Sequence, residues 1–129
     1  MDHCLRRWAF LNAHRDEEVT LQGLFLIALP FHIPHLRLFR RNIGAARLKG
    51  GHVVTFGLKG QCDTYGILDG GRHVEVELKA LHGRLKPEQK RWRTWCEEHR
   101  VPYLLCVEKK NETHEQTVQR WIEELRALL

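Results

Sequence analysis

Polar and apolar residues alternate from His73 to Lys79, which is the pattern of a β-strand with two unlike faces. The apolar face would carry Val74, Val76 and Leu78. The polar face would carry His73, Glu75, Glu77 and Lys79. The turn sequence Asp69-Gly70-Gly71 separates this strand from another apolar-rich run that begins at Gly60. The stretch 60–79 is therefore predicted to form a hairpin.

Helical spacing predicts three helices. The first is capped by Asp16, runs through Phe25 and Ala28, and is expected to stop before Pro30. The second helix begins at Pro87. It carries a mostly aromatic stripe, which we interpret as part of the core rather than as a base-stacking site: Trp92, Trp95, Cys96 and His99. The third has a capping box formed by Thr113 and Gln116. Its buried residues are predicted to be Val118, Trp121, Ile122, Leu125 and Leu129.

Three further strands complete the predicted sheet. The segment 36–40 would be a strand with its arginines on one face, and His52 to Phe56 is a β-branched run between turn signals. The apolar run 101–107 predicts a buried, central strand. We therefore expect an α/β fold, a mixed central β-sheet flanked by helices on both faces. A right-handed crossover through the Pro87 helix would make the strands 75–79 and 103–107 parallel.

Length and composition indicate one domain over residues 1–129, with 129 residues and 43% hydrophobic content. Residues 1–15 would form an N-terminal extension, in which Trp8, Phe10 and Leu11 either form a dimer surface or pack on the domain itself. We find neither an apolar run of the ~20 residues that a membrane span needs nor a signal peptide. A cytoplasmic protein is expected. The scattered cysteines, without a Cys-x-x-Cys pair, argue against a zinc ribbon and a disulfide framework.

The net charge is +5 and the pI about 9.3, and the basic residues cluster in two stretches. One-signed stretches raise the expectation of a polyanionic partner, because a solvated surface usually mixes its signs. The candidate DNA-binding residues are Arg37, Arg40, Arg41, Arg47, Lys49, Lys59, Arg84, Lys86 and Lys90.

The length of the hairpin loop decides whether the acidic residues meet. A three-residue loop pairs Leu68 with Arg72 and places Asp63 opposite Glu77, on the face that also carries Lys79. A two-residue loop would put Asp63 on the other face. Two carboxylates at this distance repel each other unless a cation lies between them, and Mg²⁺ prefers such oxygen ligands. With a lysine two residues on, this pattern fits a site for phosphodiester hydrolysis.

The order Asp63…Glu77-Leu78-Lys79 resembles the core of the PD-(D/E)xK nuclease superfamily, and neighbouring motifs resemble its VRR-NUC branch. The motifs are "RRNIGA" (40–45), "GLKGQCD" (57–63), "GGRHVEVELKA" (70–80), "GRLKPEQ" (83–89) and, in the first helix, "EVTLQ" (18–22). The resemblance covers residues 17–107. It implies a restriction-endonuclease-like fold.

The resemblance also implies roles for individual residues. Asp63, Glu77 and the backbone carbonyl of Leu78 would bind Mg²⁺, for which Mn²⁺ could substitute. Lys79 would be the catalytic lysine, with Gln89 beside it. Glu18 would complete the acidic site, directly or through water, although Glu17 could serve as well and an ordinary first-turn glutamate is the alternative.

Three positions depart from the family pattern or add to it. Cys62 stands where a proline often precedes the aspartate, and Lys86 stands where a small hydroxyl residue usually caps the helix. Glu75 is an extra acid on the polar face. It is either a third carboxylate near the metal or, as we predict, a solvated side chain.

Stand-alone members of this branch resemble archaeal-type Holliday junction resolvases, which implies branched DNA as the substrate and a homodimer as the active form. A two-fold dimer matches the near two-fold symmetry of a four-way junction. A flap or nicking nuclease is the alternative within the same class, and a non-catalytic nucleic-acid-binding module is the alternative outside it. Family habit suggests a phage or prokaryotic host.

Overall fold

The computed structural model describes residues 17–129, with side chains from residue 21 onward. The N-terminal extension, with Trp8, Phe10 and Leu11, lies outside the described residues. In chain order the elements are α2 (Glu17–His32), β1 (Arg37–Arg40), β2 (Gly44–Arg47), β3 (Val53–Phe56), β4 (Thr64–Ile67), the short helix η1 (Asp69–Gly71), β5 (His73–Lys79), α3 (Pro87–Glu98), β6 (Tyr103–Val107) and α4 (His114–Leu128). Over this part of the chain, every helix is too short or too polar to cross a membrane.

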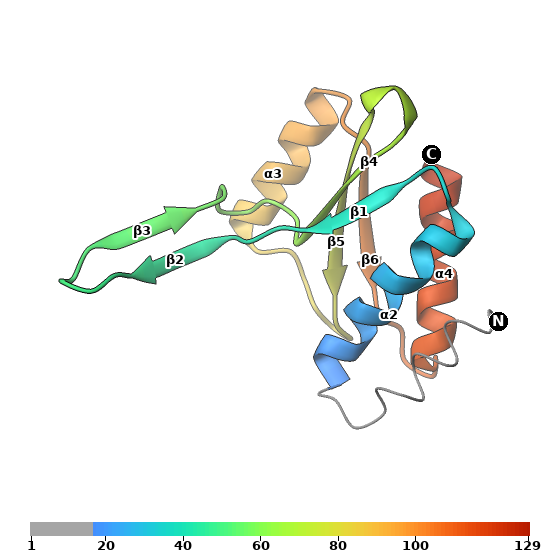
Figure 1. Cartoon of the computed structure of the whole chain (residues 1–129). Coiled ribbons are helices and arrows are strands. Elements are labelled where there is room, and N and C mark those ends of the chain that lie inside the picture. The colour runs from blue at the N-terminus through green and yellow to red at the C-terminus, as the bar shows by residue number, and fades with distance from the viewer. Residues whose placement is uncertain (1–16) are drawn as a thin grey trace.

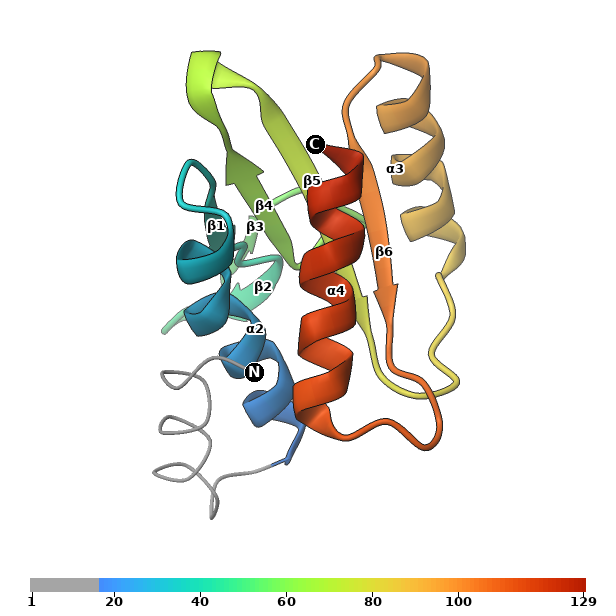
Figure 2. The same cartoon turned by 90° about the vertical axis from the view of Figure 1, so that its right-hand side faces the viewer.

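The main sheet has the strand order β1-β4-β5-β6. Strands β1, β4 and β5 are antiparallel neighbours, and β5 pairs with β6 in parallel. Helices α2 and α4 cover one face of this sheet and α3 covers the other (Figures 1 and 2). The predicted α/β class, the mixed sheet with helices on both faces and the parallel pair joined by the Pro87 helix are confirmed.

The apolar core lies between the sheet and the pair α2 and α4. Val74 and Val76 point into it from β5, and Leu78 packs at its edge, as the alternation predicts. Trp121 of α4 meets Phe25 of α2 edge to face, with ring centroids 5.6 Å apart. The capping box of Thr113 and Gln116 is present, and the predicted α4 residues are buried except Leu129, which is half-buried.

The end of α2 differs from the prediction. The helix continues to His32 with Pro30 inside its last turn. A proline removes one helical hydrogen bond, but the following turn still closes because the Ile33 N–H donates to the Leu29 carbonyl at 2.8 Å. Leu29 and Ile33 are both buried, so packing of this last turn on the core outweighs the lost bond.

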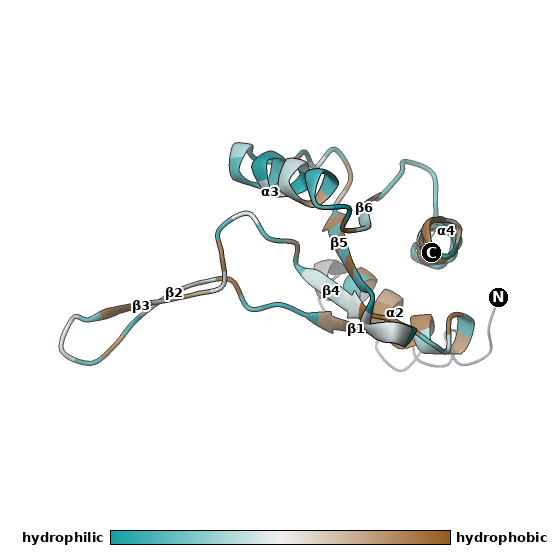
Figure 3. Cartoon of the chain, turned by 90° about the horizontal axis from the view of Figure 1, so that it is seen from above, coloured by the Kyte–Doolittle hydropathy of each residue, from teal (hydrophilic) through white to brown (hydrophobic). Residues whose placement is uncertain are grey.

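Two strand predictions need correction. Strand β6 is an edge strand of the main sheet rather than a central one. The strand is nonetheless rich in apolar residues because α3 and α4 pack against it from the two sides of the sheet (Figure 3). In β1, Arg37 and Arg40 are three residues apart, so the two-residue period of a strand directs their side chains to opposite faces rather than to one.

Strands β2 and β3 form a separate two-stranded sheet that projects from the body of the molecule (Figures 1 and 3). We call residues 44–56 the arm. The strand predicted at His52 to Phe56 is confirmed as β3, with all of its residues exposed. Strand β2 was not predicted, because Gly-Ala-Ala-Arg carries no β-branched side chain and follows a turn signal.

Candidate functional site

The hairpin of β4 and β5 has the register that brings the acidic residues together. Thr64 pairs with Val76 and Ile67 with His73, and the Leu68 N–H donates to the Arg72 carbonyl at 2.8 Å. The connection is therefore the three-residue loop. Asp63, one residue before Thr64, lies opposite Glu77, and its N–H donates to Glu77 Oε2 at 3.2 Å. The expectation that Asp63 and Glu77 meet is confirmed.

Lys79 and Gln89 complete a group that we call the carboxylate cluster: Asp63, Glu77, Lys79 and Gln89. Lys79 Nζ lies 3.3 Å from Glu77 Oε1 and donates to Gln89 Oε1 at 2.9 Å. Gln89 Nε2 donates to Glu77 Oε1 at 3.3 Å. The Lys86 N–H also donates to Gln89 Oε1, at 2.8 Å, so the glutamine side chain accepts from the residue that precedes α3. The Gln89 side-chain amide thus links the start of α3 to both Glu77 and Lys79 on β5.

The Glu77 carboxyl is poorly solvated and close to a like charge. Its side chain is 1% exposed, whereas Asp63 is exposed. Burial, followed by the neighbouring Asp63 carboxylate, raises the pKa of Glu77, Lys79 opposes both effects, and the result is a pKa of about 7. Two carboxylates with one lysine therefore leave excess negative charge that a cation can balance.

This pKa predicts a pH dependence of stability for the metal-free protein. Folding raises the Glu77 pKa from 4.5 to about 7, so the folded state binds this proton more tightly than the unfolded state does. The contribution to the free energy of unfolding is complete below pH ~4.5 and is lost as the pH rises from there through ~7, a total change on the order of 3 kcal/mol. Urea unfolding in EDTA at pH 5, 6, 7 and 8 measures this change, which Glu77→Gln should remove.

The matched control for this measurement is Glu98→Gln, which removes a carboxylate from the exposed end of α3. Its profile is expected to follow that of the wild-type protein. If the wild-type and Glu77→Gln profiles ran parallel across the whole range, the raised Glu77 pKa would be wrong.

The donors at this site fit a hard divalent cation. In β5, the Glu75 N–H and the Lys79 carbonyl form hydrogen bonds on the β6 side of the strand. Backbone groups of successive strand residues point to opposite sides, so the Leu78 carbonyl points to the β4 side, where Asp63 lies. Glu18 belongs to the first turn of α2, but its side chain lies outside the described residues. The described side chains contain no group of three or more His, Cys, Asp or Glu residues that could hold a metal ion by themselves. The available donors are two carboxylates and one carbonyl, a set that suits Mg²⁺ because this ion keeps several waters.

The prediction that Glu75 is solvated is wrong. Its carboxylate is fully buried and accepts two hydrogen bonds from the Arg41 guanidinium, at 2.8 and 3.0 Å. Trp92 Nε1 of α3 donates to it at 2.9 Å, and His73 Nε2 lies 3.0 Å away. We call these four residues the Glu75 network. Alternation correctly placed Glu75 on the polar face, but that face lies beneath α3 rather than in solvent.

Arg41 also differs from the other candidate DNA-binding residues. Its guanidinium points inward, donating to the Cys62 carbonyl at 3.1 Å and lying 4.6 Å from the centroid of the Tyr65 ring. The remaining eight candidates are exposed. They lie on β1 (Arg37, Arg40), on the arm (Arg47, Lys49), in the segment after it (Lys59), before α3 (Arg84, Lys86) and on α3 (Lys90).

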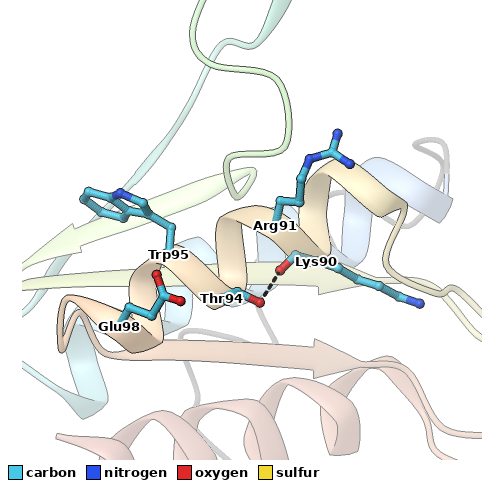
Figure 4. A pocket seen from close by; sticks show the side chains of 5 residues that line it. All are labelled: Lys90, Arg91, Thr94, Trp95 and Glu98. Atoms are coloured by element: carbon cyan, nitrogen blue, oxygen red, sulfur yellow. Dashed lines mark hydrogen bonds between the residues drawn. The ribbon is translucent and has the colours of Figure 1, made fainter.

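The aromatic stripe of α3 is only partly core. Cys96 is buried and Trp92 half-buried, but Trp95 is 45% exposed and His99 is exposed. The exposed rings stack along the helix instead: the Trp95 centroid is 5.1 Å from that of Trp92 and 4.1 Å from that of His99. Trp95 borders a shallow hollow with Lys90, Arg91, Thr94 and Glu98 (Figure 4). This hollow is separate from the carboxylate cluster.

Comparisons with known proteins yield no relative: no family model, curated protein or solved structure matches the chain. The residues of the carboxylate cluster and their geometry are therefore the basis for a candidate function.

Proposed function

We propose that this protein is a metal-dependent, structure-selective DNA endonuclease, a Holliday junction resolvase that cuts four-way junctions as a homodimer in the cytoplasm of a phage or prokaryotic host. The observation that carries the proposal is the convergence of Asp63, Glu77 and Lys79, with Gln89 bonded to the last two. The resemblance to the VRR-NUC branch of the PD-(D/E)xK superfamily supports the same conclusion. The mixed sheet covered by helices is compatible with a restriction-endonuclease-like core.

Asp63, Glu77 and the Leu78 carbonyl would hold Mg²⁺, with Mn²⁺ as a substitute, and Glu18 or Glu17 would add an acidic group from α2. When bound, the ion would make a water molecule more acidic and offset the negative charge that grows around phosphorus. Asp63 is exposed and so is accessible to solvent and substrate, whereas Glu77 is enclosed. This pairing gives the site one rigid and one accessible carboxylate.

Lys79 and Gln89 would act on the reacting groups directly. The Lys79 ammonium can orient the attacking water or neutralise a phosphoryl oxygen. Its hydrogen bond to Gln89 and its ion pair with Glu77 restrict it to one position beside the carboxylates. Gln89 would contribute by holding that lysine and by positioning water or phosphate.

The charge distribution supports a phosphate-based mode of DNA binding. Exposed arginines and lysines lie on five parts of the chain between β1 and the start of α3. Such contacts hold the DNA backbone and respond to branch shape rather than to base sequence. A two-fold dimer would place two such sites on the two strands that a junction resolvase must cut.

The deciding experiment uses a synthetic four-way junction with matched duplex, flap and single-strand controls, with and without Mg²⁺. Paired, symmetric nicks confined to the junction are expected. Cutting of flaps or linear DNA instead would retain the site and replace the resolvase by a flap or nicking nuclease. An absence of cutting in both Mg²⁺ and Mn²⁺ would overturn the enzyme proposal and favour a non-catalytic nucleic-acid-binding module.

A further inference from the structure

The arm lacks the packing that stabilises the rest of the molecule. Its eight strand residues are all exposed, and its two strands pair only with each other among the described elements. A two-stranded hairpin is marginally stable in water by itself. We therefore expect a binding partner to stabilise the arm by packing against it.

The ladder of the arm separates its side chains into two faces. Gly44 pairs with Phe56 and Ala46 with Val54, which makes one face apolar. The pairs Ala45 with Thr55 and Arg47 with Val53 form the other face, which carries a cation. Four apolar side chains of the arm, on both faces and at the turn, are largely exposed to solvent: Leu48 50%, Val53 58%, Val54 44% and Phe56 41%.

Charge favours a polyanion as the occupant. The stretch from Val19 to Cys62 contains no aspartate or glutamate, and the far half of the arm carries Arg47 and Lys49. Leu48 lies between these two cations, at the turn that its N–H closes by donating to the His52 carbonyl at 2.6 Å. The far end is thus an apolar side chain flanked by two positive ones.

Both roots of the arm are anchored beside the carboxylate cluster. On one side, the Arg41 N–H donates to the Asp63 carbonyl at 2.7 Å, and the Arg41 guanidinium binds Glu75. On the other side, Gly60 lies so close to the Glu88 carbonyl in α3 that a Cβ there would clash with it, and its φ of +100° favours glycine. The arm consequently leaves the body next to Asp63 in a defined direction.

We infer that the arm enters a groove of double-helical DNA beside the phosphodiester that is cut at the carboxylate cluster, with Arg47 and Lys49 on backbone phosphates and Leu48 and its apolar neighbours against sugar and base edges. A two-stranded β-ribbon has the width that the major groove admits. Apolar side chains flanked by cations are also used by arms that press against base steps. This inference rests on the proposed function, because it takes the cluster as the place where DNA is cut.

Two variants test the arm. Arg47→Ala/Lys49→Ala removes the charges from exposed positions. The second variant replaces Arg47–Val53 by an Asn-Gly turn, which suits a two-residue hairpin loop because Ala46 and Val54 are ladder partners at a hydrogen-bonded position, two residues from the pair that Leu48 forms with His52. The control, Arg72→Ala/Lys110→Ala, removes two charges from exposed positions in other loops. Affinity for a four-way junction and for duplex DNA is measured in EDTA from 50 to 200 mM salt, and cleavage is measured separately at saturating DNA with Mg²⁺.

Both arm variants are expected to bind DNA about 10- to 60-fold more weakly near 0.1 M salt, with a salt slope smaller by about 1.8, as the loss of two phosphate contacts predicts. The control should lose less than threefold, and cleavage at saturating DNA should persist in all three. Unchanged affinity in the arm variants would overturn the inference. So would a fall from dimer to monomer by sedimentation in the shortened variant, since the occupant would then be a second copy of the chain. Arm-dependent binding by a protein that cuts nothing would retain the arm as a DNA-binding element but overturn the proposed nuclease, and with it the placement of the arm beside a cleavage site.

Discussion

Lys79→Ala is expected to reduce junction cleavage by about a thousandfold and to leave junction affinity within a few-fold of the wild-type value. The lysine contacts both Glu77, at 3.3 Å, and Gln89, at 2.9 Å. Under the proposed function, its loss would remove a positive charge from the point where the attacking water and the phosphate meet. One phosphate contact at most is lost from DNA binding, which changes the salt slope by no more than about 0.9. Single-turnover cleavage and equilibrium binding, measured on one junction, separate the two effects.

Lys90→Ala is the matched control for this variant. It removes one lysine from an exposed position next to Gln89 in the chain, without a contact to the carboxylate cluster among the described hydrogen bonds. It should weaken binding slightly and keep cleavage at saturating DNA. If Lys79→Ala lost affinity and cleavage in equal measure, the lysine would be a binding residue, and the case for a binding module would strengthen.

Arg41→Ala is expected to lower the free energy of unfolding by about 3–5 kcal/mol, because it leaves a buried carboxylate without its charge partner. Glu75 is fully buried, and the Arg41 guanidinium supplies two of its hydrogen bonds. Trp92 and His73 still contact the carboxylate, but the Trp92 N–H carries no charge. Urea unfolding at pH 7 measures the loss, and circular dichroism at low denaturant checks that the variant folds.

The neighbouring Arg40→Ala provides a sharp comparison. Arg40 is exposed, and a surface substitution of this kind should change stability by less than about 0.5 kcal/mol. The double variant Arg41→Ala/Glu75→Gln should recover part of the stability, because a neutral amide costs less to bury than an unpaired carboxylate. A loss below 1 kcal/mol for Arg41→Ala would mean that water reaches Glu75 and replaces the guanidinium.

The meeting of Asp63 and Glu77 could be predicted because it depends on local quantities. The two-residue period assigns faces, and the loop length at Asp69-Gly70-Gly71 assigns the register. The faces and the register can therefore both be inferred from the sequence once a three-residue loop is assumed. The helices were predictable for a similar reason, since caps and apolar stripes lie within each segment.

The burial of Glu75 could not be predicted in this way. Glu75 and Glu77 occupy equivalent positions in the alternation, and what distinguishes them is which side chains arrive from elsewhere: Arg41 from the end of β1 and Trp92 from α3. The edge position of β6 was missed for a related reason. A strand covered by a helix on each face is as apolar as a central strand, so composition does not reveal how many strand neighbours it has.

The contacts of α3 with β5 have a consequence for how the chain can vary. Gln89 reaches Glu77, and Trp92, further along the helix, reaches Glu75, which is earlier on the strand. Helix and strand therefore run in opposite directions and are matched at two points, one in the carboxylate cluster and one in the Glu75 network. A helix held at two points does not depend on its tether for its position. We therefore expect the connection 80–85 to tolerate insertions and deletions while Gln89 stays beside Lys79, whereas a one-residue insertion between Gln89 and Trp92 would separate the helix from one glutamate or the other.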